Sequence, residues 1–146
     1  MADGVFNIAK GAVAEKVRDA ASNLGMLLLK ANETEADLVD HADLTALLGA
    51  VGNTEADATN YVRKTALTGT INVDNTNNRT DVDVPDQTWT SLGGATNNTL
   101  TKLIIFYDEG GTDSTRIPLT HHDFSVTTDG TDLTAQVNAA GFFRAS

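Results

Sequence analysis

The sequence predicts an α+β fold in which N-terminal helices are followed by an antiparallel β-sandwich or jelly-roll-like module. Before Thr68 the chain is rich in Ala, Leu, Val, Lys and Glu, and apolar residues recur three and four positions apart. From Thr68 onward it is rich in Thr, Asn, Asp and Gly, with short alternating apolar runs between turn residues. Short strands at such spacing are typical of antiparallel sandwiches.

The first predicted helix covers residues 6–21. Phe6, Val13 and Val17 fall on one face at helical spacing, and charged residues lie between them. Gly11 is a weak point within this helix, because glycine is a poor helix former. We expect an amphipathic helix whose apolar face packs on the sheet or on a neighbouring protein.

A short strand and a second helical region follow. The apolar run at 26–29 is too short for a helix of ordinary length and predicts a buried strand. Residues 32–51 return to helical spacing, with Thr34 as the predicted N-cap and Asp37 as the far member of a weak capping box. The stretch 59–67 is expected to open the sheet.

The second half of the chain opens with a predicted hairpin. Strands at 68–73 and 79–84 flank the polar loop 74–78, whose Asn residues tolerate left-handed backbone geometry. Pro85 ends the second strand, because proline cannot donate a hydrogen bond to a sheet ladder. A further strand is expected at 87–92.

The strongest strand prediction is 99–107. Its apolar residues are nearly continuous toward the end, so we expect a central strand that is buried on both faces. Another strand is predicted at 116–119. The Asp-Gly pair at 129–130, between alternating runs at 124–128 and 133–137, is the best hairpin signal in the chain.

These elements suggest two regions within one structural domain. Residues 1–54 form a helical region with a short strand, packed on the sheet or docking beside it. Residues 55–146 form the antiparallel β module. The apolar tail 141–144 must be buried, either in this core or in a neighbour.

The charge balance excludes two classes of partner. Among 146 residues, 20 are acidic and 10 are basic, so the formal net charge is −10 and the pI is about 4.4. This negative charge repels nucleic acid phosphates and anionic membranes, and neither is expected as a partner. No segment resembles a signal peptide, and no apolar run approaches the ~20 residues of a membrane span. We expect a protein made in the cytoplasm and not exported by this route.

The acidic loop that begins at Asp74 resembles a calcium-binding loop only superficially. An EF-hand requires glycine at the sixth position and glutamate at the twelfth, where this chain has Arg79 and Pro85. A looser calcium site formed by Asp74, Asp81 and Asp83 stays open as an alternative to a polar hairpin loop.

The other candidate for chemistry is the run His121-His122-Asp123. Adjacent side chains of a strand point to opposite faces, so the two imidazoles cannot easily share one metal ion. A hydrolase using either histidine with Asp123 is an alternative, but the chain has no Gly-x-Ser-x-Gly elbow and no cysteine. We therefore expect no enzyme, and we assign no catalytic, cofactor-binding or metal-ligating residue.

The β half resembles the small virion structural proteins of tailed bacteriophages, of the capsid-decoration or minor structural type. Those proteins have a T-x-Y-x-R strand, a polar hairpin, an aspartate-rich strand and an aromatic-Thr pair before a Gly-Gly loop. The matching segments span roughly residues 55–146 and comprise 58–64, 70–83, 87–90, 93–97, 103–108 and 117–124.

This resemblance implies a virion component that binds other phage structural proteins, the major capsid protein first among them. It further implies a homo-oligomer such as a trimer, located in the virion after synthesis in the host cytoplasm. We expect a capsid-surface decoration or cement protein. A tail, neck or fibre-base protein is the nearest alternative, and a carbohydrate-binding β-sandwich with Trp89 and Tyr107 as the sugar platform is a further one.

The residues expected to contact a partner are apolar and lie near the two ends of the sequence. We assign this role to Phe6, Val13 and Val17 of the first helix and to Phe142 and Phe143 of the tail. A thin core rich in Ala and Val favours a subunit that gains stability by docking.

Overall fold

The computed structural model describes residues 3–10, 12–19 and 21–146. Its strands are β1 (Gly4–Val5), β2 (Leu24–Ala31), β3 (Thr54–Glu55), β4 (Lys64–Leu67), β5 (Thr70–Asp74), β6 (Arg79–Asp83), β7 (Gln87–Trp89), β8 (Lys102–Asp108), β9 (Arg116–Asp123), β10 (Leu133–Ala135) and β11 (Phe143–Ala145). Its helical elements are the 3-10 turn η1 (Asn7–Ala9) and the short helices α1 (Val13–Asp19), α2 (Glu35–Leu38) and α3 (Leu44–Gly49). The fold is therefore mostly antiparallel sheet with few and short helices.

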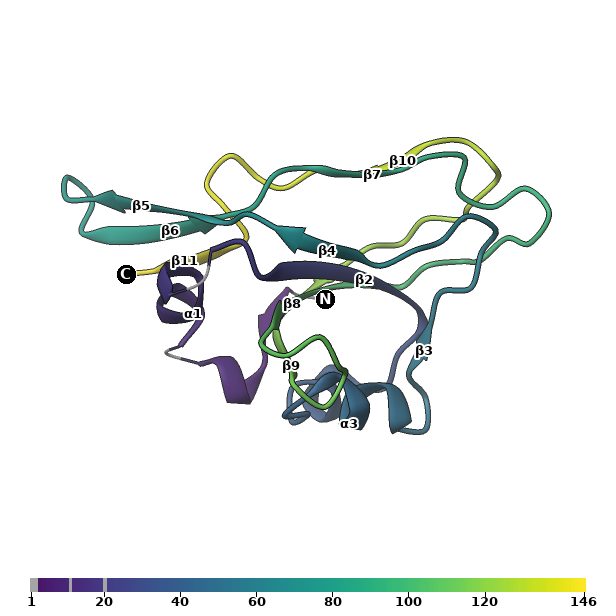
Figure 1. The fold of residues 1–146 in the computed structure, drawn as a ribbon, viewed down its shortest axis with the longest axis horizontal. Coiled ribbons are helices and arrows are strands. Elements are labelled where there is room, and N and C mark those ends of the chain that lie inside the picture. Colours follow the sequence, from purple (N-terminus) through teal and green to yellow (C-terminus); the bar gives the residue numbers. More distant parts are fainter. Residues whose placement is uncertain (1–2, 11, 20) are drawn as a thin grey trace.

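The strands form three antiparallel sheets. The largest has the order β1-β9-β8-β2-β3, and β4 also pairs with β2. A second sheet has the order β11-β6-β5, and a third consists of β10 and β7. Figure 1 shows the β7–β10 ribbon on one side of the largest sheet and α3 on the other side.

The centre of the largest sheet confirms the strongest strand prediction. Residues Leu103 to Tyr107 of β8 are all buried, between β2 and β9. The buried strand expected at 26–29 is also confirmed, as the middle of the longer β2. Because both faces of the sheet are covered, a nearly continuous apolar run is what these positions require.

The long first helix predicted for residues 6–21 is wrong as an unbroken element. Phe6 has an extended backbone, and its N–H donates to the Leu119 carbonyl (3.1 Å), which continues the pairing of β1 with β9. A 3-10 turn follows, and α1 begins only at Val13. The predicted weak point at Gly11 lies outside the described residues. The N-terminal end of the segment pairs with the sheet although its apolar spacing is helical. A helix of this length has little stability of its own, so strand pairing is preferred.

The second helical region divides into α2 and α3. The predicted cap is confirmed, since the Asp37 N–H donates to the Thr34 hydroxyl (3.3 Å). A second cap begins α3, where the Ala46 N–H donates to the Asp43 carboxylate (2.8 Å). Two capped short helices thus replace one continuous helix.

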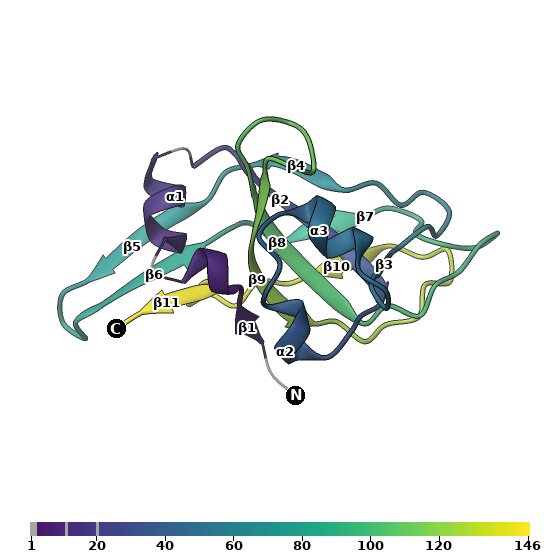
Figure 2. The same ribbon diagram turned by 90° about the horizontal axis from the view of Figure 1, so that it is seen from below.

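The predicted polar hairpin is confirmed as β5 and β6. Its register is unbroken from Thr70 opposite Asp83 to Asp74 opposite Arg79. Figures 1 and 2 show this pair projecting from the rest of the molecule, with α1 against its base and β11 beside β6. We refer to β5, β6 and the four-residue turn between them as the arm.

The hairpin predicted around residues 129–130 is wrong. The turn itself exists, because Gly130 has a φ of +94° and the Asp129 carboxylate accepts the Thr131 N–H (3.0 Å). However, β10 pairs with β7, placing Leu133 opposite Trp89, and not with residues 124–128. Local turn chemistry was sufficient to predict the turn, but the partner strand comes from elsewhere in the chain.

The change in composition near Thr68 does not mark a boundary between two sheets or between two cores. β2 lies between β8 and β3, and β1 pairs with β9, so the two halves of the sequence both contribute strands to the largest sheet and side chains to one apolar core.

Within the described part of the chain, no helix has the length and apolarity needed to cross a membrane.

Candidate functional site

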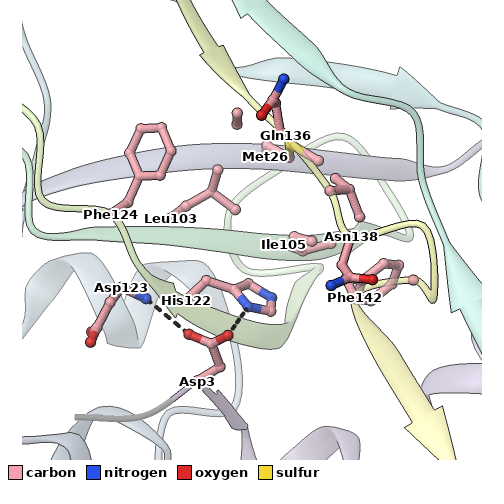
Figure 3. A pocket seen from close by; sticks show the side chains of 13 residues that line it. Asp3, Met26, Leu103, Ile105, His122, Asp123, Phe124, Gln136, Asn138 and Phe142 are labelled. Atoms are coloured by element: carbon pink, nitrogen blue, oxygen red, sulfur yellow. Dashed lines mark hydrogen bonds and ion pairs between the residues drawn. The ribbon is translucent and has the colours of Figure 1, made fainter.

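A cavity of about 260 Å³ lies between the largest sheet and the segment that leads to β11. Its floor consists of Met26 from β2 and of Leu103 and Ile105 from β8 (Figure 3). These side chains share one face of the sheet, because Met26 is opposite Ile105 in the register. The walls are mainly apolar and include Phe124 and Phe142.

The polar end of this cavity is formed by Asp3, His122 and Asp123. The Asp3 carboxylate lies 3.2 Å from His122 Nδ1 and accepts the Asp123 backbone N–H at 3.1 Å (Figure 3). His122 Nε2 is 2.9 Å from the Thr120 hydroxyl, so both ring nitrogens have partners. These contacts of Asp3 hold the segment that contains β1 next to β9.

The hydrogen bonds of Asp3 change its titration. Partial burial alone would raise the pKa of this carboxyl, but the bonds from His122 and from the Asp123 N–H more than offset that effect. The net result is a pKa below the usual value. Asp3 is therefore a structural anion in this site and not a proton donor at neutral pH.

His121 points to the opposite face of β9, as the parity of the strand predicts. It is 2 % exposed, and its ring meets Phe6 edge-on with centroids 5.8 Å apart. A Cβ added at Gly4 would lie 2.3 Å from its Nε2, so glycine is required there for the two strands to approach. The histidines do not share a site, and the described residues contain no group of three or more His, Cys, Asp or Glu placed to hold a metal ion.

Burial makes His121 an unusual histidine. Its Nδ1 has no hydrogen-bond partner among the described residues. Burial, followed by the nearby positive charge of Lys102, lowers the pKa of the imidazole below its ordinary value. The ring is consequently neutral at pH 7 and behaves as part of the core.

Lys102 is a buried cation on the same sheet. It is 4 % exposed, and its Nζ donates to Glu35 of α2 (2.6 Å) and to Asp123. Burial would lower the pKa of this ammonium, but the hydrogen bonds to the two carboxylates raise it above the usual value. The group attaches α2 to the sheet.

The T-x-Y-x-R motif has a structural role that the sequence did not suggest. The Tyr61 hydroxyl accepts the Leu28 N–H (3.0 Å) and donates to Glu55 (2.8 Å). Burial and the adjacent Glu55 charge raise the pKa of this phenol. Arg63 also contacts Glu55, through Nε at 2.6 Å.

A chain of ion pairs continues from this motif to the turn between β8 and β9. Arg63 reaches Asp113 (2.5 Å), and Arg116 pairs with both Asp113 and Asp108 (3.0 Å each). Hydrogen bonds from Arg63, only partly opposed by burial, hold the pKa of Asp113 below its usual value. The network connects β3, the segment before β4 and the β8–β9 turn. Its partners are too far apart in sequence for a motif search to find.

The three aspartates considered as a possible calcium site all interact with other groups of the protein. Asp74 accepts the Thr76 N–H (3.1 Å) and so shapes the turn of the arm. Asp81 bonds Arg144 (2.6 Å), and Asp83 accepts the Val84 N–H (2.8 Å). These contacts account for the aspartates without a cation.

The side chains assigned to partner contact lie largely in the core of the chain itself. Phe6, Val13 and Val17 are each at most 1 % exposed, so they are unavailable to a partner in this fold. Phe142 and Phe143 are half-buried and pack against the same core.

The proposed sugar platform is likewise internal. Trp89 is 2 % exposed and donates through Nε1 to the Val62 carbonyl (2.8 Å), and Tyr107 is 7 % exposed. Neither ring offers the open face that a carbohydrate would stack on. Among the described residues, the large apolar side chains that remain exposed lie in separate parts of the chain, namely Ile8, Val51, Val62 and Val73. Comparison with protein-family models, with curated proteins and with solved structures finds no match to this chain.

Proposed function

We propose that the protein is a structural component of a tailed-phage virion, and specifically a decoration protein on the capsid surface. The observation that carries this proposal is the contrast between a closely packed body and a projecting polar arm. An arm of this kind gives a subunit a contact surface beyond its own core. The virion-protein pattern of residues 55–146 includes both strands of the arm.

The architecture of the body supports the same proposal. We describe it as a sandwich, with the β7–β10 ribbon and the largest sheet as its layers and α3 on the outer side of that sheet (Figure 1). The network from Tyr61 through Arg63 to Arg116 ties distant segments of this body together. A rigid body suits a subunit that must hold its shape in a large assembly.

The charge of the chain suggests the character of its partner surface. At a net charge of −10, docking onto a shell is favoured where the shell presents basic or neutral polar groups. We propose the major capsid protein as that partner, with the decoration subunits themselves forming a homo-oligomer.

Purified particles test this proposal. Heads and tails are separated, and each fraction is analysed by quantitative mass spectrometry for peptides of this chain. The chain is expected in the head fraction, in many copies per particle, and mild denaturant should release it before the shell opens. Presence in the tail fraction alone would replace the decoration role with the tail or neck alternative. Absence from both fractions would overturn the proposal.

A further inference from the structure

The outer edge of the arm is open. Among the residues that the structure describes, β5 pairs with β6 and with no second strand. Natural edge strands are usually shielded by lysine, proline or a bulge, because their free N–H and C=O groups can recruit another strand. β5 reads Thr-Ile-Asn-Val-Asp, and its five-residue register with β6 has no bulge. The edge therefore has no lysine, proline or bulge, and its one charged residue is Asp74 at the end of the strand.

An apolar row on β5 extends past the core that covers it. Ile71 and Val73 share a face, since they are two residues apart, and Ile71 packs against the core opposite the fully buried Val82. Val73 continues this row toward the tip but is 60 % exposed. The face that the chain buries at the base of the arm thus remains uncovered farther out.

The sequence of β5 is complementary to itself in one antiparallel register. If two copies pair about Asn72, Ile71 of each lies opposite Val73 of the other, and Thr70 lies opposite Asp74. Apolar residues then meet apolar residues, and no two like charges are opposed. The same register covers Val73 on both chains.

The charges close to this edge are already balanced within the arm. Asp74 lies 3.1 Å from Arg79 Nε and accepts hydrogen bonds from the turn that follows it. A second copy consequently brings no unpaired carboxylate to the pairing edge, although the two bodies repel each other through their net negative charge.

We propose that β5 is a self-association surface, through which two copies of this chain join by antiparallel strand pairing centred on Asn72. This inference goes beyond the proposed function, because it concerns the isolated chain and does not depend on where in a particle the chain resides. The pairing would convert two three-stranded sheets into one six-stranded sheet across a two-fold axis.

Disulfide trapping tests the register directly, because the chain contains no cysteine. In Asn72→Cys, the two introduced residues face each other on the two-fold axis, at a Cα separation of about 5 Å that a disulfide can bridge. Mild oxidation should yield a covalent dimer within minutes. The matched control is Val51→Cys, on a fully exposed residue outside the arm, which reports random collision. Equal cross-linking of the two variants would refute the register.

The mass in solution provides the second test. Sedimentation equilibrium of the full chain at 0.15 M and 0.5 M salt should show a monomer–dimer equilibrium that is stronger at high salt, where the repulsion is screened. Val73→Lys should weaken the dimer about tenfold or more, whereas Val51→Lys should not. Circular dichroism and the urea midpoint verify that each variant is folded.

Besides equal cross-linking, three results of the mass measurements would overturn the inference. These are a monomer at all accessible concentrations in both salts, a trimeric mass, or a Val73→Lys dimer as strong as that of the unmodified chain. None of them bears on whether the chain is present in heads, so failure of this inference and failure of the proposed capsid location are separate outcomes.

Discussion

The body around β8 and the arm formed by β5 and β6 belong to one chain but hold their shape by different means. β8 is enclosed by neighbouring strands and by covered faces, so its residues are fixed by contacts made far away in sequence. The arm is joined to the core at its base, through Val82 and the pairing of β6 with β11, but toward its tip it depends on its own register and on a turn that Asp74 organises. Fully buried apolar side chains are therefore concentrated around β8, whereas Val73 near the tip of the arm is exposed.

The largest expected difference in the free energy of unfolding comes from truncating one apolar side chain in each region to alanine. Phe106→Ala, in a residue with no exposed surface, should lower the free energy of unfolding by about 3–5 kcal/mol, because it leaves a cavity in the core. Val73→Ala on the arm should change it by less than about 0.5 kcal/mol. Urea denaturation followed by circular dichroism measures both, and comparable losses would erase the distinction between the two regions.

The next largest effect concerns the arginines. Arg63→Ala would leave Glu55 and Asp113 without their shared cation, and we expect a loss of about 2 kcal/mol, since the pair is only partly exposed. The control is Arg79→Ala on the arm, where a more exposed pair with Asp74 should contribute at most about 1 kcal/mol. If the control proves as costly as Arg63→Ala, the arm is held more firmly than its burial indicates.

A pH series sharpens the comparison through His121. Its pKa is below the usual 6.5 in the folded state, so the unfolded state binds a proton first as the pH falls. Stability should be constant above about pH 6.5 and decrease below it, down to the folded-state pKa. His121→Phe should flatten this part of the profile. An unchanged slope in His121→Phe would show that another group is responsible.

The smallest expected effect is local. Asp74→Ala removes the acceptor for the Thr76 and Asn77 N–H groups, and we expect a cost of about 1 kcal/mol that is confined to the arm. Hydrogen exchange should accelerate at β5 and β6 and stay unchanged at β8. Faster exchange throughout the molecule would mean that the arm and the body unfold as one unit.

Features that depend on local chemistry could be predicted from the sequence. β8 was predictable because a continuous apolar run requires cover on both faces. The arm was predictable because two alternating runs flank an Asn-rich turn, and the Thr34 cap because a hydroxyl three residues before an acidic residue is a helix-start signal.

Features that depend on distant partners could not be predicted. The segment 6–21 carries a helical pattern, but Phe6 is held by Leu119, more than a hundred residues away. The strand after Gly130 finds its partner in β7, which no turn signal can specify. Arg63 and Asp113 likewise meet only through the fold, so the network, and with it the role of the Tyr61 motif, required the structure.

The pairing of β1 with β9 has a consequence for how the molecule forms. Gly4 lies opposite His121, so β1 can pair with β9 only after more than a hundred further residues have been made. Until β8 has been made, the apolar β2 likewise lacks its neighbour in the sheet. Topologies dominated by such non-local pairs fold slowly. Formation of this sheet should thus be a slow step of folding, because its central and edge pairings both join distant parts of the chain.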